Sequence, residues 1–476
     1  MRPTLRRSCD SCVKFKLRCD LRTPRCSRCV KRDVKCVYAN QPLTVPVRIS
    51  HDGSIAPLDG RETLRAYRFG SFDPFDSYPP TRLPRQHVQR LIQSFLHKIA
   101  FQYYPLDLSP TSNPFLVSWW PLALGDPALF HVSLQTACLD EELLAQRGFR
   151  ASEILMADSV ALLRHKVMDT SLAVQDGTMN SVITLAAIEF GKGNIKTSEM
   201  HVHGVKRLVD MRGGINSVRQ TSPLTARMIS WVSMIVMGQP QFLTQDDTGV
   251  GDGIPLVPEW QSDMTTMEND PYFLSIIDML VDDEVRNVLS RLRTAFEMAS
   301  RVPLSSTRLH DLTCFVVHRL LLHHTVFEQH TLSPITECIR YATILYMFII
   351  HGPTYYSHEV FTHKLVLRMR SNLETLYSSP RYYEPIDIWI MAIGLVASFN
   401  TPQYQWFVDK AIHIVSSLQA SSWVDILTHV KAVLWMETAQ GDRIFRPHWD
   451  AMPLAIGAVD VTQGLTDGFD TFMQLT

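Results

Sequence analysis

Residues 9–36 read CDSCVKFKLRCDLRTPRCSRCVKRDVKC and hold most of the cysteines of this 476-residue chain. Their spacing is Cys-x2-Cys-x6-Cys-x6-Cys-x2-Cys-x6-Cys. The first three cysteines recur seventeen residues later, so the stretch consists of two similar half-units. The six positions are Cys9, Cys12, Cys19, Cys26, Cys29 and Cys36.

The cysteine count predicts two zinc ions per chain. A structural zinc takes four tetrahedral ligands, and no His, Asp or Glu recurs at a ligand spacing in both half-units. One Zn2+ would leave two thiolates over, whereas two ions need eight ligand positions from six cysteines. Two cysteines must therefore bridge. The bridges should be symmetry-equivalent, and the first cysteine of each half-unit, Cys9 and Cys26, is the natural choice.

Other uses of these cysteines fit less well. A disulfide framework suits a small secreted chain, but this chain is long and has no apolar signal sequence after Met1. An iron-sulfur site or a four-cysteine zinc ribbon would leave thiolates over and would not explain the repeat. The run VKFKLR between Cys12 and Cys19 is too short for a stable isolated helix, so we expect residues 9–36 to need zinc to fold.

The charge distribution predicts a polyanionic partner. Residues 1–36 contain eight Arg and four Lys against three Asp, a formal charge of plus nine. The whole chain carries minus one, so residues 37–476 carry minus ten. A basic arm on an acidic body is typical of nucleic-acid binding.

The stretch closely resembles the fungal binuclear zinc-cluster DNA-binding domain, in which six cysteines hold two zincs and the first and fourth bridge. The resemblance extends to Lys16, Leu17, Arg18 and Asp20 around the third cysteine and to Pro24 in the loop between the half-units. It covers about thirty residues of the chain.

The resemblance implies that Lys16, three residues before the third cysteine, contacts a CGG-type triplet. A helix end in the major groove lets a lysine donate to the guanine O6 and N7 acceptors. The sequence departs from the family pattern at Val13 and Phe15, where a basic residue is common.

The other basic residues are assigned to the DNA backbone. We expect Lys14, Arg18 and Arg7 to meet phosphates, and we favour the same role for Lys31 and Arg32 over a merely solvated helix face. Residues 1–8 form a basic arm, which could touch phosphates or an importin or be a plain solvated terminus.

Beyond the cluster, residues 37–84 form a Pro-rich linker without a coiled-coil heptad pattern, which leaves monomeric binding or dimerisation through the body open. Residues 85–455 show helical periods and no convincing strand alternation, which predicts a large all-α domain with one core or two subdomains. A helix from 85 to about 99 opens it. Asp126-Pro127 should start the next. The others are expected at 151–168, 178–190, 197–212, 271–300, 308–327, 333–351, 358–378, 385–399, 403–419 and 422–438.

A second, looser resemblance, to the helical regulatory region of fungal zinc-cluster regulators, covers residues 189–214. The histidines and cysteines of the body are interpreted as packing groups. Two acidic segments stand out: the loop 239–270 without Lys or Arg, and the tail 456–476, in which Asp alternates with apolar residues as in disordered activation segments. No transmembrane segment is expected.

These observations predict a small zinc-stapled binuclear cluster module followed by a large all-α regulatory domain. The implied function is a nuclear, sequence-specific regulator of transcription, with activation favoured. The expected partners are double-stranded DNA and transcriptional coactivators, and a homodimer through the helical body stays open beside monomeric binding. The alternatives are a DNA-binding repressor or scaffold and, much less favoured, an enzyme on the helical body. The short chain without a coiled coil resembles regulators of fungal secondary-metabolite gene clusters.

Overall fold

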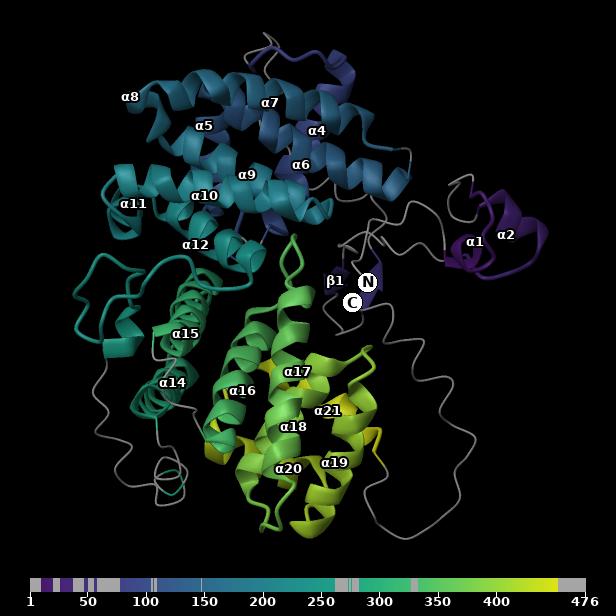
Figure 1. The fold of residues 1–476 in the computed structure, drawn as a ribbon, viewed down its shortest axis with the longest axis vertical. Helices are drawn as coiled ribbons and strands as arrows, with labels where there is room; N and C mark the ends of the chain where they lie inside the picture. The colour runs from purple at the N-terminus through teal and green to yellow at the C-terminus, as the bar shows by residue number, and fades with distance from the viewer. Residues whose placement is uncertain are drawn as a thin grey trace. The chain divides into compact units, whose positions relative to one another are not determined.

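The protein is described by a computed structural model that covers residues 10–19, 26–36, 47–49, 55–57, 78–103, 106, 109–146, 148–261, 273, 275, 282–326 and 333–452. Most of these residues are helical (Figure 1). The contacts between Cα atoms divide the chain into two compact units: Met1–Tyr103, Pro110–Gly204 and Val459–Thr476 form the first, and Tyr104–Ser109 and Val205–Ala458 form the second. The all-helical body that the sequence predicts therefore has two subdomains.

The cysteine-rich module contains two five-residue helices, α1 (Asp10–Lys14) and α2 (Ser27–Lys31). Such short helices are unstable alone, so contacts around the cysteines must hold them. After the module, β1 (Val47–Ile49) and β2 (Ile55–Pro57) pair antiparallel. The sequence does not indicate these strands, because three residues are too few for an alternation to show.

The first unit is a helical array around α6 (Pro127–Ala145), which packs against α4, α5, α7 and α9. The Asp126 side chain accepts hydrogen bonds from the Ala128 and Leu129 N–H groups, which confirms the predicted cap and its first-turn proline. Residues 128–140 are all buried, so α6 is the core of this unit. The other elements are α4 (Arg85–His97), η1 (Ile99–Phe101), the π-helical turn η2 (Phe115–Trp119), α5 (Trp120–Gly125), α7 (Arg150–Met168), α8 (Thr170–Ala173), α9 (Asp176–Gly191) and α10 (Ile195–Met211), whose last turns belong to the second unit.

The second unit is built on two apolar helices, α16 (Pro334–His351) and α18 (Pro385–Ser398), which pack against each other. Helix α16 also contacts α15 and α17, and α18 contacts α19, α20 and α21 (Figure 1). The remaining elements are α11 (Ile215–Thr221), α12 (Pro223–Met237), η3 (Pro258–Gln261), α14 (Asp283–Arg301), α15 (Ser306–Val326), α17 (Glu359–Leu376), α19 (Tyr404–Ser417), α20 (Trp423–Val433) and α21 (Ala439–Asp450).

The helix positions differ from the sequence prediction in several places. The helices α5, α8, α11, α12 and α21 were not predicted, and α20 ends at Val433 instead of 438. Helix α14 begins at Asp283, and most of the earlier part of its predicted span lies outside the described residues. No described helix is both long enough and apolar enough to cross a membrane.

Candidate metal centre and nucleic-acid interface

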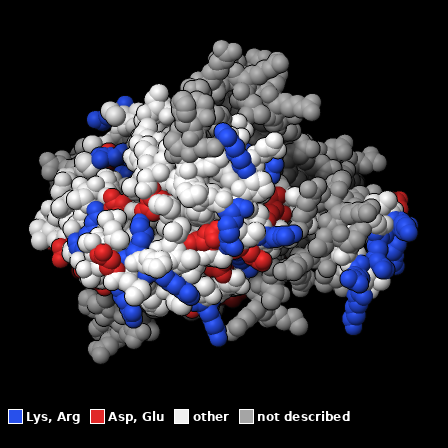
Figure 2. Space-filling view, turned by 90° about the horizontal axis from the view of Figure 1, so that it is seen from above, with Lys and Arg blue, Asp and Glu red and all other residues white. Residues whose placement is uncertain are grey.

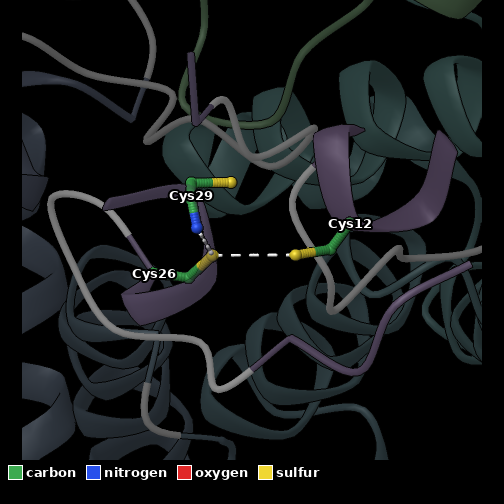
Figure 3. A group of neighbouring side chains, drawn as sticks. All are labelled: Cys12, Cys26 and Cys29. Atoms are coloured by element: carbon green, nitrogen blue, oxygen red, sulfur yellow. Dashed lines mark hydrogen bonds between the residues drawn. The ribbon is translucent and has the colours of Figure 1, made fainter. Parts of the chain in front are cut away.

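Three cysteines of the module lie together in its interior. Cys12, Cys26 and Cys29 are each at most 1% exposed, and their sulfur atoms all lie within 4.8 Å of one another. The Cys12 and Cys26 sulfurs are 3.7 Å apart (Figure 3). Two thiolates on one tetrahedral zinc, with Zn–S bonds of about 2.3 Å, lie about 3.8 Å apart. The spacing therefore fits a shared zinc ion.

Cys26 contacts cysteines of both half-units. Its sulfur faces Cys12 of the first half-unit and accepts a 3.4 Å hydrogen bond from the Cys29 N–H of the second (Figure 3). Its own N–H donates to the Cys36 sulfur at 3.3 Å. Cys19 and Cys36 pack, partly buried, against this group. Cys9, the sixth predicted ligand, lies outside the described residues.

The backbone repeats between the half-units as the cysteines do. Lys16 and Asp33, seventeen residues apart, both have a left-handed backbone, with φ of 51° and 45°. After each, an N–H reaches back to the carbonyl of a cysteine: Leu17 to Cys12 at 2.8 Å, and Val34 to Cys29 at 3.1 Å. This pattern is the Schellman end of a helix, and it turns the chain so that the third cysteine of each half-unit returns to the cluster.

The predicted DNA-binding residues lie at these two helix ends. Lys14, Lys16 and Arg18 are exposed at and just after the end of α1, and Lys31 and Arg32 are exposed at the end of α2. In Figure 2, Lys and Arg side chains make up most of the described charged surface at the far right, where this module lies. The described module therefore presents a cationic surface suited to a polyanion. Arg7 lies outside the described residues.

Two contacts join the half-units on this surface, and neither was predicted from the sequence. The Arg32 guanidinium carbon lies 4.9 Å from the centroid of the Phe15 ring. The Ser11 hydroxyl donates to the Lys35 carbonyl at 2.6 Å. The repeat carried a signal for the first contact, since Phe15 and Arg32 occupy equivalent positions seventeen residues apart.

The described part of the acidic loop, 239–261, is packed on helices of the second unit. Asp247 forms an ion pair with Arg319 at 2.5 Å and accepts a hydrogen bond from the Trp260 indole at 2.8 Å. Burial alone would raise the pKa of Asp247, but the hydrogen bond from Trp260 and the charge of Arg319 outweigh it, so that its pKa is lowered. The Asp247 carboxylate therefore joins the loop to Arg319 and Trp260 and stabilises the fold.

The remaining cysteines and several histidines are buried in the helical units. Burial raises the thiol pKa of the three cysteines outside the module, which disfavours the thiolate form that binds metals. His201 has a pKa lowered by burial, while His203 is exposed on the same helix, α10. Within the described ranges, the Cys12, Cys26 and Cys29 group is the one set of three potential metal ligands with suitably close donor atoms.

Comparisons with known proteins agree with this geometry. Residues 7–44 match the model of the fungal Zn(2)-Cys(6) binuclear cluster domain, and residues 90–241 match the fungal specific transcription factor domain. The chain is similar to transcription factor pgmR of Aspergillus terreus, with 53% identity over 112 residues, or 23% of this chain and 58% of that protein. The chain thus spans less than two thirds of that relative. No solved structure matches.

The cysteine group and the two family matches point to the same cofactor and the same class of protein. A domain of the six-cysteine kind binds two zinc ions, and the close sulfur atoms of this module suit that role. The match to residues 90–241 lies in the helical part of the chain, where the second resemblance was noted. Residues 7–44 and 90–241 are thus similar to two domains of fungal transcription factors.

Proposed function

We propose that this chain is a nuclear, zinc-dependent, sequence-specific DNA-binding regulator of transcription by RNA polymerase II, and that it acts as an activator. The observation that carries the proposal is the buried sulfur group of Cys12, Cys26 and Cys29 beneath two cationic helix ends. A metal-held scaffold with exposed lysines is suited to placing a base-reading side chain in the major groove.

The proposed metal ligands are the six cysteines of residues 9–36, with Cys9 and Cys26 each bound to both zinc ions. The position of Cys26 between the half-units supports its bridging role. The two ions supply a rigid link between helices that could not persist alone. Backbone N–H groups donate hydrogen bonds to the Cys26 and Cys36 sulfurs, which links these two cysteines to the backbone of the second half-unit.

Lys16 is the proposed base reader. Its left-handed backbone places it at the point where the chain leaves α1, and its side chain is exposed. An ammonium group there can donate to both O6 and N7 of guanine in a CGG-type site. Phosphate contacts are assigned to Lys14, Arg18, Lys31, Arg32 and Arg7.

Activation is assigned to the tail, residues 456–476, which lies outside the described residues. The competing acidic segment is the loop, and the ion pair of Asp247 with Arg319 argues against a free activation segment there. The proposed partners of the whole chain are double-stranded DNA, coactivators and a second copy bound through the helical units. Control of a secondary-metabolite gene cluster stays a prediction.

Binding of the full chain to duplex DNA tests the proposal. A good base contact discriminates between sequences by about 1 to 3 kcal/mol, whereas phosphate contacts add affinity to all sequences alike. Lys16→Ala should therefore reduce discrimination between a CGG duplex and a scrambled duplex, while Arg18→Ala should weaken binding to both equally. Full discrimination by the Lys16→Ala protein would move the reading role to another residue, with Lys14 next.

The class of regulator needs a second measurement. Expression of a reporter gene placed under the selected site should rise when the full chain is expressed. A fall in reporter expression, or no change although the protein occupies the site, would favour a DNA-binding repressor or scaffold. Absence of any sequence preference in the binding assay would contradict the DNA-reading function itself.

A further inference from the structure

An aromatic ring lies exposed on the cationic surface of the module. The Phe15 side chain is 50% exposed, between the exposed Lys14 and Lys16 in the sequence. A half-exposed phenyl group forgoes much of the free energy that burial would provide, which is roughly 1.5 to 3 kcal/mol for a large apolar side chain. Its position beside the proposed base reader suggests that the ring is buried when DNA is bound.

The ring is held from the other half-unit. The Arg32 guanidinium carbon lies 4.9 Å from the ring centroid, within the range of a cation–π contact. Stacking occupies one face of the guanidinium and leaves its in-plane N–H groups able to reach a phosphate. Arg32 can therefore position the Phe15 ring and contact the DNA backbone at the same time.

The repeat explains why the second half-unit supports the first in this way. The position equivalent to Lys16 is Asp33, which has the same left-handed backbone but a negative charge. A carboxylate repels phosphates and cannot donate to guanine. A base-reading lysine at this position is thus confined to the first half-unit, and Arg32 stabilises the residue next to it.

We propose that Phe15 is a specificity-determining residue whose ring packs against the C5-methyl group of a thymine adjacent to the guanines contacted by Lys16, with Arg32 as its positioning residue. Phenylalanine contacts thymine methyl groups in major grooves, where each base pair presents a distinct edge. The neighbouring cations favour DNA over an apolar protein partner as the occupant of this face. The inference rests on the DNA-reading function proposed above.

The test uses the zinc-loaded full chain and a library of DNA duplexes in which a CGG triplet has randomised flanks. Selection should enrich a thymine next to the triplet. Each thymine of the selected site is then replaced singly by deoxyuridine, which removes only the methyl group. At one position the wild-type protein should bind about fourfold more weakly, the change expected when one methyl group is no longer buried.

Substitutions in the module then show which side chain contacts that methyl group. Phe15→Ala should bind the thymine and deoxyuridine duplexes equally, and Arg32→Ala should reduce the difference between them. Val30→Ala is the matched control, because Val30 is another exposed apolar residue of the module, 56% exposed, and should keep the fourfold difference. Zinc analysis should give two ions per chain in every variant, which separates a lost methyl contact from a lost fold.

Two results would overturn the inference and leave the proposed function intact. In the first, the wild-type protein prefers CGG but binds every deoxyuridine duplex as tightly as its thymine counterpart. The Phe15 ring would then contact something other than a methyl group, such as a protein. The other is a Phe15→Ala protein that keeps the fourfold difference. Loss of all sequence preference in the wild type would instead contradict the proposed function.

Discussion

Acidification should destabilise the second unit through its buried histidines, and His318 allows the size of the effect to be worked out. This side chain on α15 is fully buried, and its Nδ1 lies 2.7 Å from the Cys314 carbonyl oxygen, to which it donates. Burial lowers the pKa of His318 from 6.5 to about 4. The folded chain therefore keeps this imidazole neutral at a pH where the unfolded chain protonates it.

The direction follows from the two pKa values. Because the folded pKa is the lower one, the stabilising contribution is fully present above pH 6.5 and is lost progressively as the pH falls towards 4. A pH of 5 lies about 1.5 units below the unfolded pKa of this group. Protonation of His318 therefore lowers the free energy of the unfolded state by about 2 kcal/mol relative to the folded state. His310, His358 and His448 also have pKa values lowered by burial and should add to the trend.

Urea unfolding of the full chain at pH 7.5 and pH 5.0, followed by tryptophan fluorescence, measures the effect. His318→Gln should lose about 2 kcal/mol less stability between the two pH values than the wild type, whatever its stability at pH 7.5. Groups that the charge of His318 does not affect titrate alike in both chains and cancel in this comparison. His413→Gln, a change at an exposed histidine of α19, should keep the wild-type pH dependence. An equal loss in the His318→Gln and wild-type proteins would refute the argument.

Three further outcomes are expected. Metal analysis of the purified chain should find two zincs, and Cys26→Ser should lower the content of both because this thiolate is shared; a single zinc in the wild type would contradict the binuclear arrangement. Gly394→Ala should destabilise the second unit by about 1 to 3 kcal/mol, because the added methyl group would overlap the fully buried Phe407 ring; an unchanged urea midpoint would show that the α18–α19 contact relaxes freely. Deleting residues 460–476 should cut reporter activation without changing DNA binding or protein level; full activation would exclude the tail, and a fall in protein level would indicate that the tail stabilises the helical units.

The metal module could be predicted from the sequence because its chemistry is local. Cysteines at fixed spacings within residues 9–36 must supply every ligand, so counting thiolates was sufficient to expect two zincs. Helix starts were predictable for the same reason. The Asp126 cap is an interaction with N–H groups two and three residues ahead.

Helix α20 shows where local reasoning fails. Its predicted span continued to 438, but the chain becomes extended at Leu434, whose carbonyl accepts a hydrogen bond from the Trp389 indole. The Met436 N–H in turn donates to the Tyr346 hydroxyl. Side chains of α18 and α16 thus satisfy backbone groups that a continuing helix would have used, and these partners are far away in the sequence. Helix α12 was missed because it is buried on nearly all sides, which removes the apolar stripe that a sequence pattern detects.

By itself, the sequence determined the zinc module, its cationic character and the helical class of the rest, because each depends on residues within a few turns of one another. Only the tertiary structure decided the division into two units, the ion pair that joins Asp247 of the acidic loop to Arg319, and the contact of Phe15 with Arg32. Those features join residues that are distant in the chain or lie in different half-units. They form because the whole fold brings together apolar surfaces and opposite charges from distant residues, and no short stretch of sequence contains both partners.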